Sequence, residues 1–351
     1  MATTGRKSGE IGYWAFMMSE RRAQPHLSKE ALTVHCSKLW RKGGYDSYGR
    51  PLEQLLTREA QEQAEMLRMK GDVKDWVEMS HQAGTLQDLH FYIIQANVFC
   101  LTEEKGVVPA EICLARVSLK DGVQEVYHEF INPGPLPLGY RADCMANSAK
   151  THQIPLQLDL ANSNYGEMVE GMVQFVGREG SSLPGLYMLP RYQRQTRLVL
   201  DWLQDKVTPG VRSALQLSSL PCLLFHMVRV GRELPGGIQV PTESLAEVQL
   251  DRDVFLYGSG VACSWHEEQD QMEHCSAGIV RRWSYILLHL ACPRHCVELL
   301  PGRHLPPLVP RESVSSCTSA SSHKKASTKS RRPRAPPSTE VWLPSTWGTP
   351  A

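Results

Sequence analysis

Two cysteines and a histidine lie close together in the segment CSWHEEQDQMEHC, which covers residues 263–275. Cys263, His266 and Cys275 offer two thiolates and an imidazole, which are preferred zinc ligands, and a tetrahedral zinc ion needs one ligand more. The spacing matches no common zinc finger, so two buried cysteines with a surface histidine are an equally good interpretation. His274, next to Cys275, is a rival nitrogen ligand. The segment therefore predicts a metal site whose ligand set is left open.

Two further places carry metal-ligand types. The segment CPRHC, residues 292–296, could bind a metal, but we interpret it as a helix end with incidental thiols. Glu111 opens the apolar strand segment EICLARVSL, and a charged residue that leads a buried strand needs a partner. On pattern alone, an exposed glutamate at a strand edge is the simpler interpretation of Glu111.

Two histidines are candidate proton-transfer groups, because imidazole titrates near neutral pH. They are His128 in YHEF and His152 in KTHQIP. No catalytic triad can be built around either of them from the sequence, so we interpret both as structural.

The elements that must position these residues change in character along the chain. Residues 11–80 have helical patterns: Ser28 is a capping residue for the segment that follows it, and a long amphipathic helix after Pro51 is expected to end at Gly71. From Leu89 onward, three apolar segments predict strands of one sheet, the later two joined as a hairpin. Helices follow, which favours an α/β or α+β domain that ends near residue 300.

Composition limits the class of protein. The chain has 351 residues, 42% of them apolar, and 38 Lys plus Arg balance 37 Asp plus Glu, which excludes a uniformly basic coat and an acidic disordered chain. No apolar run reaches the ~18 residues of a membrane-spanning helix, and the first ten residues lack the apolar stretch of a secretory signal. Ten cysteines are too sparse for a disulfide scaffold, so we expect a soluble intracellular protein of about two domains.

The C-terminal residues 306–351 are rich in Ser, Pro, Thr and Lys, and we predict that they are disordered. Between His323 and Pro336 they carry six basic residues in two groups. This run fits a nuclear import signal or a polyanion contact, and a tail kept soluble by its charge is an equal alternative.

The N-terminal strings GYWAFM, CSKLW and EAQEQAEMLR together resemble an HMG box over residues 8–78, with a plain three-helix bundle as the alternative. Large rings must fill the small core of such a box, and the candidates are Tyr13, Phe16 and Trp40. HMG boxes grip bent duplexes and junctions, and the basic residues expected to contact nucleic acid are Arg6, Lys7, Arg21, Arg22, Lys38, Arg41 and Lys42. The arm before the first helix is reduced to Arg6 and Lys7, so we predict weak, shape-selective binding.

Behind this box, the strings PAEICLARVSL, YHEFINPGPLPLGYRADC, SAKTHQIPL and CSWHEEQDQMEHC together resemble the Maelstrom family, over about residues 8–300. The resemblance implies that residues 85–305 adopt an RNase H-like fold, a mixed sheet flanked by helices and related to DnaQ-type exonucleases. It also implies a structural zinc ion held by Glu111, Cys263, His266 and Cys275.

The same resemblance implies a function. It points to silencing of transposable elements by the piRNA pathway in germ cells during gametogenesis and meiosis. The expected partners are single-stranded or structured RNA, DNA or chromatin as a further target, and piRNA-pathway proteins. The expected locations are perinuclear cytoplasmic germ granules and the nucleus.

Exonuclease chemistry is expected to be absent. DnaQ-type enzymes hold two metal ions with acidic residues that begin with an Asp-x-Glu pair on the first strand. If Glu111 stands on that strand, Cys113 occupies the paired position and supplies no second carboxylate. Soft Cys and His ligands favour a closed zinc site over magnesium. The family's association with metal-independent RNA cleavage makes a single-strand-specific endoribonuclease one alternative, and a chromatin architectural protein is another.

Overall fold

The computed structural model describes residues 16–18, 20–41, 52–102, 106–177, 185–258 and 260–308. Among the described residues, the helices α2 (Lys29–Arg41) and α3 (Leu52–Gln82) precede the sheet, and residues 16–18 and 20–23 are also helical. The Ser28 hydroxyl accepts a hydrogen bond from the backbone N–H of Ala31 (3.2 Å), so the predicted cap is confirmed.

The predicted end of the long helix at Gly71 is wrong. Helix α3 has 31 residues and passes through Gly71 to end at Gln82. A helical glycine costs roughly 1 kcal/mol relative to alanine. The residues that follow it bury Val73 and Val77 against the core of the sheet domain, and this burial offsets the cost. The second half of α3 therefore packs with the sheet domain, across the boundary predicted near residue 78.

The described strands form one five-stranded sheet in the order β3-β2-β1-β4-β5. Its members are β1 (Phe91–Leu101), β2 (Val107–Ser118), β3 (Gly122–Phe130), β4 (Leu186–Met188) and β5 (Leu217–Ser219). Strand β2 is antiparallel to β1 and β3, whereas β1, β4 and β5 are parallel to one another. The three predicted strands and their hairpin are confirmed. Strands β4 and β5 contain only three residues each and gave no periodic signal.

The hairpin between β2 and β3 depends on Gly122. Its φ is +73°, in the left-handed region, and a Cβ there would lie 2.5 Å from the carbonyl oxygen of Arg303. Glycine is therefore required on two counts, backbone conformation and space.

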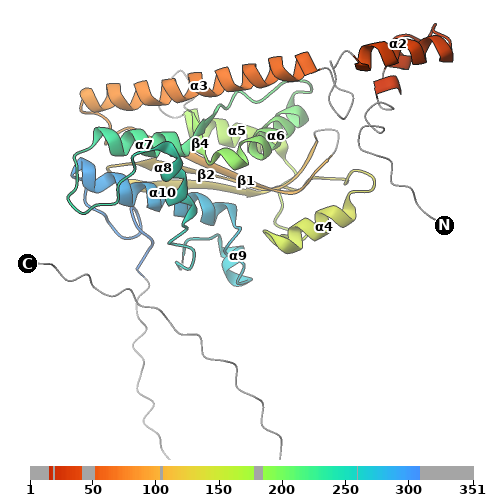
Figure 1. Ribbon diagram of the computed structural model, residues 1–351. Helices are drawn as coiled ribbons and strands as arrows, with labels where there is room; N and C mark the ends of the chain where they lie inside the picture. The colour runs from red at the N-terminus through yellow and green to blue at the C-terminus, as the bar shows by residue number, and fades with distance from the viewer. Residues whose placement is uncertain are drawn as a thin grey trace, which may run out of the picture. The chain divides into compact units, whose positions relative to one another are not determined.

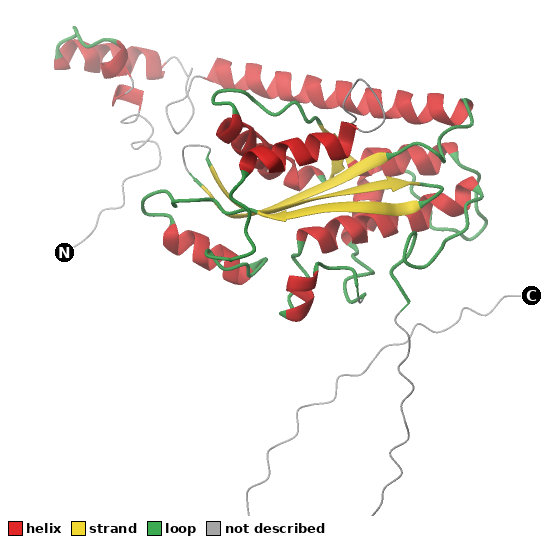
Figure 2. Ribbon diagram, turned by 180° about the vertical axis from the view of Figure 1, so that it is seen from behind, coloured by secondary structure: helices red, strands yellow, loops and turns green. Residues whose placement is uncertain are grey.

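Helices cover the sheet on both sides, as Figures 1 and 2 show. They are α4 (Arg141–Lys150), α5 (Tyr165–Val176), α6 (Pro190–Val207), α7 (Leu220–Val230), α8 (Glu243–Asp251), α9 (Ser264–Glu268), α10 (Ser276–Ala291) and the 3-10 turn η2 (Cys292–His295). The architecture is mixed α/β, which is compatible with the predicted fold class. No helix among the described residues is long and apolar enough to cross a membrane.

Each face of the sheet has its own core. Tyr92 and Ile94 of β1 pack on one side with apolar residues of α5 and α6. The alternating residues Phe91 and Ile93 pack on the other side with α3, α7, α8 and α10. Because β1 is buried on both faces, it reads as a nearly continuous apolar run rather than as an alternating one.

The N-terminal helices have a much smaller core in the described part. Phe16, Leu32 and Cys36 are buried together. Tyr13 lies outside the described residues, and so does the side chain of Trp40, although its backbone belongs to α2. The HMG box therefore stays a prediction. Residues 309–351, which make up almost all of the predicted tail, also lie outside the described part of the chain.

Candidate metal centre

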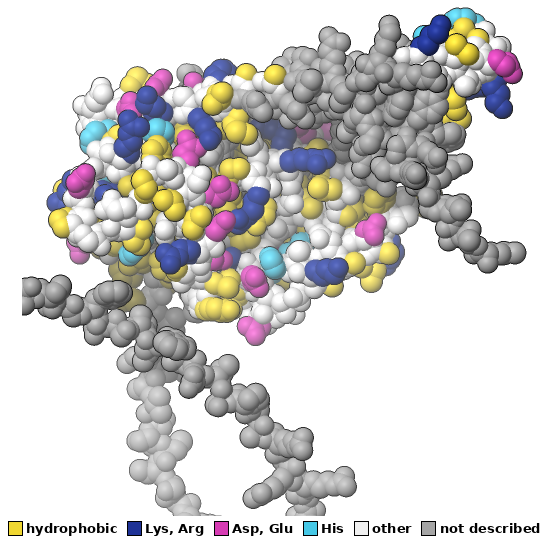
Figure 3. All heavy atoms as spheres, in the orientation of Figure 1, with side chains coloured by type: hydrophobic (Ala, Val, Ile, Leu, Met, Phe, Trp, Pro, Cys, Tyr) yellow, Lys and Arg dark blue, Asp and Glu magenta, His cyan; other side chains and the backbone are white. Residues whose placement is uncertain are grey.

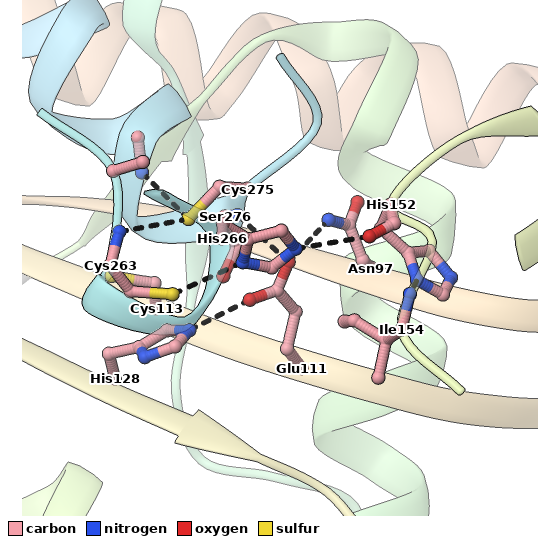
Figure 4. Close-up of polar contacts among 12 residues, drawn as sticks. Asn97, Glu111, Cys113, His128, His152, Ile154, Cys263, His266, Cys275 and Ser276 are labelled. Carbon is pink, nitrogen blue, oxygen red and sulfur yellow. Dashed lines mark hydrogen bonds and ion pairs between the residues drawn. The ribbon is translucent and has the colours of Figure 1, made fainter. Parts of the chain in front are cut away.

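The predicted Cys and His residues come together at the starts of two helices. Potential ligand atoms of Cys263, His266 and Cys275 all lie within 4.8 Å of one another. Cys263 is the N-cap residue of α9, His266 lies within that helix, and Cys275 is the N-cap residue of α10. The Cys263 Sγ lies 3.1 Å from the His266 Nδ1, as Figure 4 shows. We call these three residues the α9–α10 cluster.

The ring of His266 is held from its other side. Its Nε2 donates a hydrogen bond to the carbonyl oxygen of His152 (3.1 Å), which leaves Nδ1 free to face the sulfur atoms. A histidine that binds a metal usually donates its second nitrogen in this way. Burial acts to lower the pKa of His266, but the hydrogen bond with Cys275 and the charge of Glu111 outweigh burial and raise it.

The two thiols form an unequal pair. The hydrogen bond from Cys275 lowers the pKa of the Cys263 thiol, and the same bond, together with burial, raises the pKa of Cys275. The Cys275 Sγ also accepts hydrogen bonds from the backbone N–H groups of Cys263 (3.3 Å) and Gly278 (3.4 Å). These donors and the N-terminus of the 16-residue helix α10 favour negative charge on sulfur. A divalent cation could replace the shared proton.

Glu111 belongs to strand β2, lies next to the α9–α10 cluster and is completely buried. Its carboxylate accepts hydrogen bonds from the Asn97 Nδ2 (2.7 Å), the backbone N–H of Ser276 (2.9 Å) and the His128 Nε2 (2.7 Å). Burial acts to raise the pKa of Glu111, but the hydrogen bond and charge of His128 outweigh it and lower the pKa to about 2. The exposed strand-edge interpretation is therefore wrong. The assignment of Glu111 to the first strand is also wrong, since it stands on the second.

The residues present fit a zinc ion. Two sulfur atoms and one nitrogen converge, and the anionic Glu111 is joined to the backbone of Ser276, the residue that follows Cys275. Phe130 and Trp265 pack edge to face with ring centroids 5.6 Å apart, and both rings also contact the ring of His266. Glu111 is the nearby oxygen donor, although it is not one of the three residues whose ligand atoms lie within 4.8 Å of one another.

The rival ligands lie elsewhere. The His274 side chain is 41% exposed and its ring is 3.9 Å from the Glu273 carboxylate, so it is not part of the cluster. In the segment CPRHC, the Cys292 thiol donates to the carbonyl oxygen of Leu119, and the His295 ring bonds the carbonyl oxygen of Met227. Cys296 is exposed. These contacts are those of a helix end, as expected for that segment.

His128 and His152, the two histidines considered as proton-transfer groups, both make hydrogen bonds within the fold. His128 pairs with Glu111 and keeps 15% of its side chain exposed. His152 is buried, with its Nε2 3.2 Å from the Val98 carbonyl oxygen, while its Nδ1 accepts from the Ile154 N–H. Burial lowers the pKa of His152 to about 4.

Two polar residues of β1 complete the site and were missed from the sequence. Gln95 and Asn97 stand opposite Cys113 and Glu111 of β2, so all four point to the same face of the sheet. Both amides are buried, and neither amide atom of Gln95 hydrogen-bonds to a residue that the structure describes. The signal was present, because Gln95 and Asn97 interrupt an otherwise apolar run. The first strand of this sheet thus carries Gln-x-Asn, and neutral amides do not replace the carboxylates of a two-metal site.

A hollow of about 320 Å³ opens beside the α9–α10 cluster. Tyr257, which is 88% exposed, lies at this hollow. The other lining residues are Lys150, Thr151, Gln153, Leu256, Asp270, Gln271, Met272, Glu273 and His274. The lining therefore combines one lysine, two carboxylates, two amides, a histidine and an exposed aromatic ring.

The predicted nucleic-acid contacts lie only partly within the described chain. Arg21, Arg22 and Lys38 are exposed. Arg6, Lys7 and Lys42 lie outside the described residues, as does the side chain of Arg41. On the face shown in Figure 3, basic and acidic side chains are interspersed, in keeping with the net charge of +1.

Comparison with known proteins identifies relatives. Residues 101–309 match the family described as "Maelstrom: piRNA pathway germ-plasm component". A Protein maelstrom homolog of Xenopus tropicalis is 30% identical over 206 residues, 58% of this chain and 47% of that protein. The Protein maelstrom homolog of Culex quinquefasciatus is 27% identical over 274 residues, which cover 75% of this chain and 52% of that protein. Protein maelstrom of Drosophila melanogaster is 24% identical over 302 residues, which cover 78% of this chain and 65% of that protein. The chain spans about half to two thirds of the length of these relatives.

Proposed function

The chain belongs to the Maelstrom family, a family of piRNA-pathway germ-plasm components, and from this premise we propose that it is a nucleic-acid-binding factor that silences transposable elements in germ cells. In this proposal its sheet domain, residues 85–305, is RNase H-like in fold but does not perform two-metal nuclease chemistry. The proposed setting is gametogenesis and meiosis, in perinuclear germ granules of the cytoplasm and in the nucleus, together with other piRNA-pathway proteins.

One observation carries the proposal: the place where such a sheet would hold catalytic metal ions contains ligands of the wrong kind for them. Neutral amides of Gln95 and Asn97 stand on β1, and the α9–α10 cluster faces the adjacent Glu111. We infer that Cys263, His266, Cys275 and Glu111 hold zinc. When bound, the ion supplies a rigid link between β2 and the starts of α9 and α10, and a closed four-ligand set leaves no position for an attacking water.

The hollow beside the cluster supports RNA binding at an unpaired base. The ring of Tyr257 is exposed and can stack on a base, and Lys150 can approach the adjoining phosphate. Asp270 and Glu273 also line the hollow, and their negative charge disfavours a phosphate inside it. The interior is therefore suited to the edge of a base, with the amides of Gln153 and Gln271 as hydrogen-bonding groups.

The N-terminal helices supply a second proposed contact. Arg21, Arg22 and Lys38 are exposed near the small core formed around Phe16, as a box that grips bent or junction nucleic acid requires. Arg6, Lys7, Arg41 and Lys42 belong to the same proposed surface. DNA and chromatin are further targets of this surface, and structured RNA is the first.

The test measures binding of the purified full chain to labelled single-stranded RNA, RNA duplex and junction DNA. Tyr257→Ala should weaken binding of single-stranded RNA by roughly tenfold, since stacking contributes about 1–3 kcal/mol per base. Leu138→Ala, a fully exposed apolar residue outside the hollow, is the matched control and should bind as the parent does. Unchanged RNA affinity in Tyr257→Ala would remove the hollow from the proposal.

A single-strand-specific endoribonuclease is the second candidate, favoured by the pair of Glu111 and His128. Their 2.7 Å hydrogen bond resembles a carboxylate that orients a general base, and the His128 ring is partly exposed. Cleavage that persists in EDTA and disappears in His128→Gln would support this function. Equal cleavage by His128→Gln and the parent would assign the activity to other residues or to a contaminant.

A further inference from the structure

A second group of metal-ligand side chains lies among the helices and shares no residue with the α9–α10 cluster. Potential ligand atoms of Cys222, His226 and Glu243 all lie within 4.8 Å of one another. Cys222 is completely buried, His226 is 6% exposed, and the Glu243 side chain is 29% exposed. We call these residues the α7–α8 cluster.

The helix ends explain why the three residues meet. Ser219 caps α7 by accepting from the Cys222 N–H, and Pro221 occupies the first turn of that helix. Cys222 and His226 are four residues apart, so they lie on the same face of α7, one turn from each other. This helix packs against both α3 and α8. Thr242 caps α8 and thereby places Glu243 at its first position.

One ring nitrogen of His226 has no partner among the described residues. The Nδ1 of His226 is buried, and it makes no hydrogen bond within the part of the chain that the structure describes. A buried polar atom without a partner costs roughly 1–3 kcal/mol, so native structures seldom keep one without a reason. A bound cation satisfies such a nitrogen, whereas an apolar neighbour does not.

Lys70 of α3 is the neighbour that a metal ion would meet. Its ammonium group pairs with the Glu243 Oε2, and its carbonyl oxygen accepts from the Cys222 thiol at 3.8 Å. A carboxylate has two oxygen atoms, so one can bind an ion while the other keeps the lysine, as the outer-shell partners of metal ligands do. With Cys222 as a thiolate and His226 neutral, these four side chains carry one net negative charge, which a divalent cation would more than balance.

We propose that Cys222, His226 and Glu243 bind a zinc ion, with solvent in the fourth position, at the place where α7 packs against α3 and α8. Binding displaces the Cys222 proton to solvent and forms one sulfur, one nitrogen and one oxygen bond to the ion. The thiolate and imidazole select zinc over magnesium or calcium. The ion links α7 to α8. Because α7 also packs against α3, zinc binding stabilises the junction between the N-terminal helices and the sheet domain.

The experiment measures zinc in the full chain after reloading and dialysis against a weak chelator. We expect two zinc ions per parent chain and one in each of Cys222→Ser, His226→Gln and Glu243→Gln. Cys292→Ser, a buried thiol of the same core that belongs to neither cluster, is the control and should keep both ions. Cys263→Ser should lose the other ion. If that protein aggregates, the comparison of Cys222→Ser with Cys292→Ser decides the matter alone.

A second measurement separates a metal site from an ion-pair network. Lys70→Met removes the competing ammonium group, so zinc competition against a chromogenic chelator should show affinity at the α7–α8 cluster that equals or exceeds the parent's. Co²⁺ bound there should give a thiolate charge-transfer band that disappears in Cys222→Ser. Equal zinc content in Cys222→Ser and the parent would overturn the proposal, whether the parent holds two ions or one. A single ion that is lost in Cys263→Ser and kept in Cys222→Ser would likewise overturn it.

Discussion

The two faces of the sheet are built on different principles, although the same strands supply both. Toward α5 and α6, residues such as Tyr92, Ile94 and Ala96 make a continuous apolar core. Toward α10, the apolar residues Phe91 and Ile93 give way along the same strand to Gln95 and Asn97. Both faces are held by apolar area removed from water, but only the face toward α10 also ends in buried polar groups, most of which depend on hydrogen bonds.

The difference shows where sequence change can be tolerated. An apolar core accepts other residues of similar volume. The polar end is interdependent: Glu111 accepts hydrogen bonds from Asn97, Ser276 and His128 at once, so its removal breaks three hydrogen bonds together. A buried carboxylate is costly, so the position of Glu111 beside the α9–α10 cluster agrees with the metal site proposed at this end of the sheet.

The largest effect on stability should come from removing a proposed zinc ligand at the polar end of the sheet. Cys263→Ser should lose zinc and unfold or aggregate, because binding energies of structural zinc (roughly 10–16 kcal/mol in small domains) rival the 5–15 kcal/mol stability of a typical domain. Thermal unfolding with and without a chelator checks this. Cys296→Ser, an exposed thiol, should melt as the parent does. A metal-free protein with an unchanged melting temperature would refute the structural zinc ion.

A slightly smaller effect is expected when the carboxylate alone is removed. Glu111→Leu should destabilise the protein by about 3–5 kcal/mol, because the partners of a buried charge are left uncompensated. Urea unfolding measures the change. Glu111→Gln keeps the shape and can still accept from Asn97 and Ser276, so it should cost less. Equal losses in the two variants would show that packing, rather than charge and hydrogen bonding, determines stability at this position.

The apolar face provides the contrast. Ile94→Ala should cost about 2–5 kcal/mol through lost burial and an internal cavity, and the loss should be the same in chelator as in zinc. Its zinc content should match that of the parent. A variant of this face that lost zinc would show that the two faces are coupled through the sheet, and the comparison between them would fail.

The sequence predicted the strands that carry a long apolar signal. It also singled out three candidate metal ligands within thirteen residues of one another, whose ligand atoms the structure brings within 4.8 Å. The residue pattern alone could not show that Glu111 lies beside the cluster, because folding joins positions far apart in the chain. Only the family resemblance named Glu111 as a ligand. The end of α3 was misplaced, since the burial of Val73 and Val77 overrides the local preference of Gly71. The α7–α8 cluster was missed, although Cys222 and His226 have the four-residue spacing of a helical ligand pair.

A smaller effect concerns pH. Burial lowers the pKa of His152 from about 6.5 to about 4, so the folded protein resists a proton that the unfolded chain accepts below about pH 6.5. The contribution of His152 to the unfolding free energy is therefore most favourable above pH 6.5, and the unfolding free energy falls as the pH drops toward 4. At about 1.4 kcal/mol per pKa unit, the loss approaches roughly 3 kcal/mol.

His152→Gln isolates this contribution, because glutamine can still donate to the Val98 carbonyl oxygen but does not titrate. Its unfolding free energy should depend less on pH between 7 and 4 than that of the parent. His274→Gln, whose ring is exposed, is the control and should follow the parent. Parallel pH profiles for His152→Gln and the parent would show that the buried ring does not set the acid sensitivity.

The smallest effect on stability, together with a large effect on binding, is expected from exposed basic side chains of the N-terminal helices. Arg21→Glu, Arg22→Glu and Lys38→Glu change exposed side chains, so each should alter the unfolding free energy by less than about 0.5 kcal/mol. If these cations contact phosphates, the triple variant should bind junction nucleic acid more weakly, and the salt dependence of the affinity should become shallower by roughly one counterion for each lost contact. Unchanged salt dependence, with zinc content and melting temperature also unchanged, would assign nucleic-acid binding to the hollow at Tyr257 alone.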